Sequence, residues 1–161
     1  MQTRLDYSKA APGSVQAMYK LQKYVDASGL EHSLLELVKT RVSQINGCAF
    51  CIDMHTKDAR AAGETEQRLY GLSAWREAPY YTEPERAALA WAEVVTLISQ
   101  THATDEQYEA TRAQFSEEEL VKLTMAVIAI NGWNRLSIAF RPEVGKYEPA
   151  AKAASSASPG A

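Results

Sequence analysis

The chain is 161 residues long, with 46% hydrophobic residues, 23% charged residues and a formal net charge of −3. This length is enough for one hydrophobic core and short for two independent domains, so we expect a single globular domain. The charge is small and no run of lysine or arginine occurs, so neither nucleic acid nor an anionic membrane surface is an expected partner. The first ten residues contain no apolar signal core, and no window approaches the roughly 20 apolar residues that span a bilayer, which predicts a cytoplasmic protein.

Apolar residues recur at intervals of three and four positions along most of the chain, which predicts helices with almost no strand signal. In the first half of the chain the predicted helices cover residues 14–27, 31–45, 48–62 and 65–75. Gly29 and Gly63 are at positions where a glycine commonly ends a helix. Ser33 and Glu36 have the spacing of a capping box at the start of the second helix.

Three more helices are predicted to start at Thr82, Thr104 and Ser116, each followed three residues later by Glu or Gln, as in a capping box. The last of them runs to about residue 140 and is apolar over most of its circumference, so we expect it to be the central buried helix. Gly132 within it predicts a close helix contact or a kink.

The fold class predicted from these patterns is all-α. We expect one helical domain over residues 1–147, followed by a disordered tail over residues 148–161 that contains no large apolar residue.

The chain has two cysteines, Cys48 and Cys51, and His55 follows the second by four residues. At about 100° per residue, the three side chains lie within roughly 60° of one another on one helical face, so they can converge. In a reducing compartment, a disulfide that closes so short a loop would constrain the unfolded chain little. The pair is therefore predicted to be reactive or to bind a metal.

A reactive pair needs a thiolate, because a free cysteine has a pKa of about 8.5 and its thiol is a poor nucleophile. The start of a helix favours an anion near Cys48, and His55 can take or share the proton of Cys51. A second thiol then captures a sulfenic acid as a disulfide. Glu36, on the preceding helix, would lie beside His55 if an antiparallel helix pair turned at residues 46–47, completing a proton relay.

Other roles are open for the same residues. Together with His55 and Glu36, the two cysteines could form a three- or four-ligand zinc site, although closed structural sites usually use two separated ligand pairs. Cys48 and Cys51 could also be inert core residues. Glu36 could cap its own helix together with Ser33.

Residues 36–63, ELVKTRVSQINGCAFCIDMHTKDARAAG, resemble the alkylhydroperoxidase AhpD-like family of the carboxymuconolactone decarboxylase superfamily. The features that carry the resemblance are a Glu twelve residues before the first Cys and a His four residues after the second. Residues 68–98 and 131–141 also look like shorter members of that family. The resemblance implies an all-helical fold that oligomerises, with a homo-hexamer built from dimers as the expected assembly.

By this resemblance, Cys51 is the peroxidatic cysteine, Cys48 the resolving cysteine, His55 the proton acceptor and Glu36 the far end of the relay. The helix dipole alone favours Cys48 as the thiol with the lower pKa, whereas the four-residue step to His55 favours Cys51. Well-studied peroxidases of the family have a histidine just before the second cysteine, where this chain has Phe50. That difference leaves the amount of turnover and the substrate open.

The leading hypothesis is a thiol-dependent peroxidase that reduces a hydroperoxide and is regenerated by an external dithiol. No cofactor or metal is part of it, and neither flavin nor haem is required. The resemblance points to a lipoyl-type dithiol, while thioredoxin-like donors stay open. The alternatives are a redox sensor or thiol–disulfide exchange protein with little turnover, and a metal-binding protein. Lactone decarboxylation is disfavoured because the enzymes that perform it do not rely on this cysteine pair.

Overall fold

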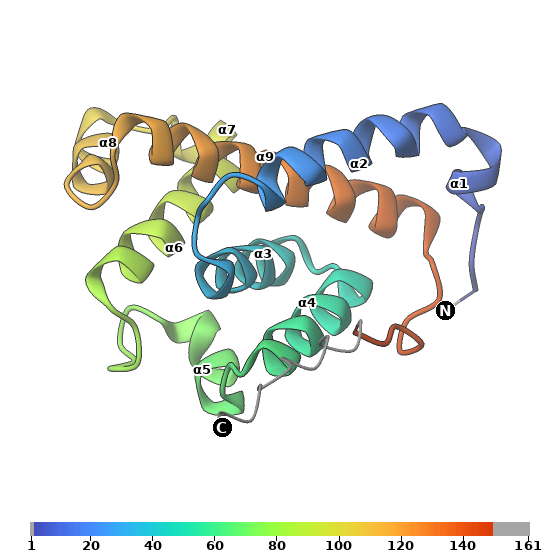
Figure 1. The fold of residues 1–161 in the computed structure, drawn as a ribbon, viewed down its shortest axis with the longest axis horizontal. Coiled ribbons are helices and arrows are strands. Elements are labelled where there is room, and N and C mark those ends of the chain that lie inside the picture. Colours follow the sequence, from blue (N-terminus) through green and yellow to red (C-terminus); the bar gives the residue numbers. More distant parts are fainter. Residues whose placement is uncertain (1, 150–161) are drawn as a thin grey trace, which may run out of the picture.

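The computed structural model describes residues 2–149, and within them the regular structure is entirely helical (Figure 1). The all-α prediction is confirmed. The predicted disordered tail, residues 148–161, lies outside the described residues except for 148 and 149. The helices are α1 (Tyr7–Ala10), α2 (Pro12–Asp26), α3 (His32–Asn46), α4 (Ala49–Ala62), α5 (Glu66–Gly71) with a 3₁₀ turn (Leu72–Ala74), α6 (Glu83–Thr96), α7 (Ile98–Thr101), α8 (Asp105–Arg112) and α9 (Glu117–Phe140). None of these helices is long and apolar enough to cross a membrane.

Capping explains where several helices begin. The capping boxes predicted at Thr82, Thr104 and Ser116 are all formed, and each of these side chains accepts a hydrogen bond from a backbone N–H in the first turn. The capping box predicted for α3 is wrong. This helix begins one residue before Ser33 and has no side-chain cap, so the Glu36 side chain is free for another role.

Helix α3 occupies the centre of the fold, between the α2 and α9 pair, α6 and α4 (Figure 1). Its Leu37, Val38 and Val42 are completely buried. The last helix was predicted to be central and buried. It packs on α2, α3 and α6, but its burial is incomplete, because Val121 and Ile128 of α9 are exposed. An apolar circumference does not bury a helix unless partners cover every face.

The close contact predicted at Gly132 is confirmed. A Cβ atom at this position would lie 2.7 Å from Cε of Met18 on α2. Helices α2 and α9 therefore run side by side at a spacing that a larger residue would disturb (Figure 1).

A two-residue turn joins α3 to α4 and places the cysteine pair. Gly47 ends α3 with a positive φ of 70°, a conformation that glycine adopts without strain. Cys48 follows directly as the N-cap of α4, and its backbone N–H donates to the Ser43 carbonyl at 2.9 Å. The tight turn sends α4 back along α3.

Gly47→Ala is expected to reduce the free energy of unfolding by about 1 kcal/mol or more, because an L-residue is strained at this φ. Urea unfolding measures the effect. Gly13→Ala in α2 is the matched control, because a Cβ there meets nothing within 4 Å and alanine favours the helix. Equal urea midpoints for the two variants would contradict the strain assigned to Gly47.

Candidate active site

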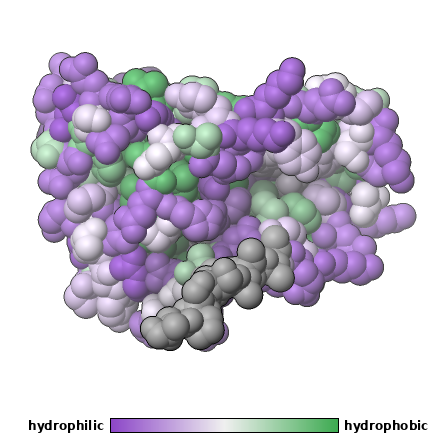
Figure 2. Space-filling view, in the orientation of Figure 1, coloured by the Kyte–Doolittle hydropathy of each residue, from purple (hydrophilic) through white to green (hydrophobic). Residues whose placement is uncertain are grey.

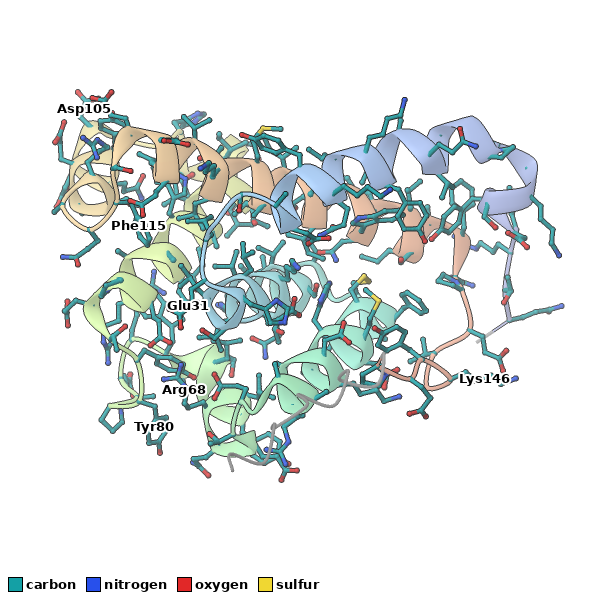
Figure 3. The ribbon with its side chains drawn as sticks, in the orientation of Figure 1. Glu31, Arg68, Tyr80, Asp105, Phe115 and Lys146 are labelled. Carbon is teal, nitrogen blue, oxygen red and sulfur yellow. A yellow bond between two sulfur atoms is a disulfide. The ribbon has the colours of Figure 1, made fainter. Side chains whose placement is uncertain are left out.

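Cys48 and Cys51 form a disulfide at the start of α4 (Figure 3). Their Cα atoms are 5.3 Å apart, and each residue is 1% exposed. The backbone N–H of Cys51 donates to Sγ of Cys48 at 3.3 Å, so the sulfur of Cys48 caps the helix. The structure holds the oxidised state of the pair, in which neither sulfur is a thiolate that could bind zinc.

His55 and Glu36 meet across the α3–α4 hairpin, 19 residues apart in sequence. Nδ1 of His55 lies 2.9 Å from Oε2 of Glu36, and both side chains are buried. An ionised carboxylate can only accept a hydrogen bond, so we assign the imidazole proton to Nδ1. That tautomer leaves Nε2 of His55 with a lone pair that can accept a proton.

Lys39 is a third member of this buried group, which sequence reasoning missed. Its Nζ donates to Oε1 of Glu36 at 2.9 Å, and the Lys39 side chain is 7% exposed. A second carboxylate, that of Asp26 on α2, lies 3.8 Å from Nζ. The available signal was a basic residue three positions after Glu36, on the same face of the helix. This spacing also describes ordinary ion pairs on a helix surface. Glu36 thus bonds His55 with one oxygen and Lys39 with the other.

The environment of Glu36 keeps its carboxylate ionised. Burial raises the pKa of Glu36, but the hydrogen bond and charge of His55, followed by the charge and hydrogen bond of Lys39, lower it to about 2. The carboxylate is therefore charged throughout the physiological pH range.

This shift predicts an acid-sensitive contribution to stability. Because the folded pKa of Glu36 is below the ordinary value of 4.5, the unfolded chain binds the proton more tightly, and the stabilisation is present above pH 4.5. It is lost as the pH falls toward 2, and its full size is on the order of 3 kcal/mol. Urea unfolding at pH 5 and at pH 2.5 measures this contribution. Between these two pH values, we expect the free energy of unfolding to fall more for the parent than for Glu36→Gln. Equal losses would contradict the shift.

A cavity of about 640 Å³ lies beside this group. On the face shown in Figure 2, the surface is hollowed between α9 and α4, with hydrophobic side chains inside the hollow. One side of the cavity is lined by Cys51, His55, Glu36 and Lys39. Its aromatic walls are Tyr7, Tyr19, Phe50, Trp133 and Tyr147, from both ends of the chain and from α4. Cys48 is not among the lining residues, so Cys51 is the cysteine of the pair that faces the cavity.

The segment after α9 closes one side of the cavity. The Tyr147 hydroxyl donates to Oδ1 of Asp58 at 2.7 Å, and Nζ of Lys57 donates to the Tyr147 carbonyl at 2.9 Å. Burial, followed by the hydrogen bond to Asp58, raises the pKa of Tyr147 to about 12, so the phenol keeps its proton. These bonds, and one from Lys57 to the Gly145 carbonyl, hold the segment against α4, and Tyr147 forms part of the cavity wall.

Among the described residues, Glu36, His55 and Asp58 place potential metal-ligand atoms within 4.8 Å of one another. Both oxygens of Glu36 are already bonded, one to His55 and one to the Lys39 ammonium. A cation placed there would face the positive charge of Lys39, so the cluster fits a metal ion poorly.

Comparison with known sequences identifies a matching family and two similar proteins. Residues 12–94 match the sequence model of the carboxymuconolactone decarboxylase family. The uncharacterized protein YdfG of Bacillus subtilis is 48% identical over 139 residues, which are 86% of this chain and 95% of that protein. The uncharacterized protein YnjA of Escherichia coli is 28% identical over 113 residues, 70% of this chain and 59% of that protein.

Solved structures show the same fold. A protein of unknown function from Agrobacterium tumefaciens, whose name connects it with the antioxidant defence protein AhpD, has a TM-score of 0.87 and 50% identity. The match covers 89% of this chain and 99% of that one. The debrominase Bmp8, solved with 2,3,4-tribromopyrrole, has a TM-score of 0.74 and 20% identity, over 86% of this chain and 74% of that one. The last similarity shows a shared fold alone.

Proposed function

The chain belongs to the carboxymuconolactone decarboxylase family as an AhpD-like member, and from this premise we propose that it is a thiol-dependent peroxidase. One observation carries the proposal. Cys51, half of an oxidisable pair, lines a cavity together with His55, whose Nε2 is free to take a proton. A buried histidine held by a carboxylate beside a cysteine is the arrangement that activates a thiol nucleophile.

The first step uses the reduced protein and a hydroperoxide, ROOH. His55 takes the proton of the Cys51 thiol, and the thiolate attacks the terminal peroxide oxygen. The S–O bond forms as the O–O bond breaks, and ROH leaves with the proton returned by His55. Cys51 is oxidised by two electrons to a sulfenic acid.

The second step consumes the sulfenic acid. The Cys48 sulfur attacks the Cys51 sulfur, the S–S bond forms, and the hydroxyl leaves as water after taking up a proton. The product is the disulfide of the present structure. An external dithiol then reduces the pair and is itself converted to a disulfide.

Access to the sulfurs favours a small dithiol as the reductant. Each cysteine is 1% exposed, so a protein donor of the thioredoxin type cannot reach the sulfurs without a rearrangement. The cavity leads to Cys51 and has room for a lipoyl-type chain. We therefore propose a lipoyl-type dithiol. The aromatic walls favour an organic hydroperoxide with an apolar body over hydrogen peroxide.

Steady-state consumption of cumene hydroperoxide with dihydrolipoamide tests the function, with hydrogen peroxide as the small comparison substrate. We expect turnover that is faster with the organic hydroperoxide. A single oxidation without turnover would support the redox-sensor alternative. Elemental analysis of the reduced protein tests the metal-binding alternative, which requires stoichiometric zinc.

The assembly and the cytoplasmic location stay predictions. We propose a homo-oligomer, with the hexamer as the expected state, and the exposed Val121 and Ile128 of α9 are apolar side chains that a subunit contact would cover. Light scattering at micromolar concentration tests the assembly, and a monomer would contradict it.

A further inference from the structure

Lys39 is a buried charged side chain that the reaction steps above do not use. A buried ammonium is costly unless it is paired, so a lysine at this position needs a specific partner. That partner is Glu36, at 2.9 Å, while the carboxylate of Asp26 is farther away and exposed. Among residues 2–149, Lys39 is the one lysine or arginine within ion-pair distance of Glu36.

The charges of this buried group balance only because Lys39 is present. With a neutral imidazole, Glu36 and Lys39 sum to zero. Without the ammonium, the same group would carry one net negative charge in a region of low dielectric. Such a site binds a proton tightly, and the proton would be held between His55 and Glu36. The ammonium of Lys39 thus balances the charge of Glu36, which would otherwise be balanced by a proton bound between His55 and Glu36.

We propose that Lys39 is a positioning residue for the peroxidase reaction, because it neutralises Glu36 and so keeps His55 unprotonated and able to take the proton of Cys51. Its part in turnover rests on the function proposed above, whereas its effect on His55 is a property of the site itself. The relay therefore ends at His55. Glu36, bonded through both oxygens, orients the imidazole and is not the destination of the proton.

Other titratable groups surround the pair, and their charges make the compensation by Lys39 more important. They are Tyr7 from α1, Tyr19 and Asp26 from α2, His32 from α3, Asp58 from α4, Glu64 after α4 and Tyr147 after α9. Tyr147 is neutral because its pKa is raised to about 12. The carboxylates among them add negative charge around the imidazole of His55, and the ammonium of Lys39 offsets that charge.

The test follows the imidazole signals of the disulfide form by NMR as a function of pH, because that form has no thiolate to perturb His55. The chain has three histidines, and His55→Gln identifies the signal. In Lys39→Met, we expect His55 to hold its proton to a pH at least about one unit higher than in the parent. Lys39→Arg keeps the charge and is expected to restore the parent midpoint.

Lys122→Met is the matched control, because Lys122 forms an ion pair with Glu118 on α9 and does not line the cavity. Its His55 midpoint is expected to equal that of the parent. An unchanged midpoint in folded Lys39→Met would overturn the proposal. If that variant does not fold, Lys39→Gln replaces it, since its amide still donates to Glu36 without a charge, and the same criterion applies.

Turnover separates this inference from the proposed function. In Lys39→Met, the limb of the pH–rate profile that belongs to His55 is expected to move to higher pH with the NMR midpoint. If the NMR midpoint of His55 shifts but the pH–rate profile does not, Lys39 acts on His55 but has no role in turnover. An absence of turnover in the parent would count against the peroxidase and leave the NMR result intact.

Discussion

Cys51→Ser is expected to abolish hydroperoxide consumption, whereas Cys48→Ser is expected to react once and then stop. The reason is that Cys51 lines the cavity, while the Cys48 sulfur is turned into the start of α4 as its cap. Without Cys48, the sulfenic acid has no second thiol, because the chain has only two cysteines. Stopped-flow measurement of peroxide loss and mass spectrometry of a dimedone adduct follow the two outcomes.

The same labelling experiment also shows whether the peroxidatic and resolving roles of Cys51 and Cys48 are reversed. The cap position of Cys48 places its sulfur at the positive end of the helix dipole, which also favours a thiolate there. If dimedone labels Cys48 in Cys51→Ser and labels nothing in Cys48→Ser, the roles are reversed. The double variant, which has no thiol, is the control for non-specific labelling.

Glu36→Gln is expected to lose at least about tenfold in the alkylation rate of Cys51 at neutral pH. The glutamine oxygen can still accept from Lys39, but its amide nitrogen then faces Nδ1 of His55 as a donor. The imidazole must take the other tautomer, in which Nε2 carries the proton and cannot accept that of Cys51. Alkylation rates measured against pH show the loss, and part of it is recovered as the thiol ionises unaided at high pH.

The same substitution is expected to reduce the free energy of unfolding, by about 3–5 kcal/mol if it behaves as the loss of one partner from a buried ion pair. Glu93→Gln is the matched control, because Glu93 is a half-buried carboxylate paired with Arg41 and Arg76 and does not line the cavity. It is expected to lose stability without loss of thiol reactivity. Superimposable alkylation profiles for Glu36→Gln and the parent would refute the role of Glu36.

Much of the helical structure could be predicted because its determinants are local. Apolar spacing and the caps at Thr82, Thr104 and Ser116 act within one or two turns. Helices α1 and α7 were missed because four residues are too few to display a helical period. The central position of α3 could not be predicted, because burial depends on which helices pack around it.

In the candidate site, too, the features that local sequence determines could be predicted, whereas those that depend on packing could not. Helical spacing places Cys51 and His55 at the same cavity and Cys48 within bonding distance of Cys51, and the two-residue turn brings Glu36 to His55. Lys39 was missed because a lysine in a helix is usually solvated, and only the folded structure shows that its side chain is buried near Asp26 of α2. The contact of Tyr147 with α4 joins segments 89 residues apart in sequence, which no local pattern could reveal.

The α3–α4 hairpin carries the complete reactive group, from Glu36 to His55, whereas the cavity walls include Tyr7 and Tyr147 from opposite ends of the chain. Under the proposed function, the residues that react all lie on the hairpin, whereas most of the aromatic cavity wall comes from segments outside it, with Phe50 as the exception. If the proposed reaction is correct, substitutions in the outer segments are expected to change which molecules enter the cavity while the hairpin keeps its chemistry. For protein engineering, the same division identifies Tyr7, Tyr19 and Tyr147 as the positions to randomise and the hairpin as the part to leave intact.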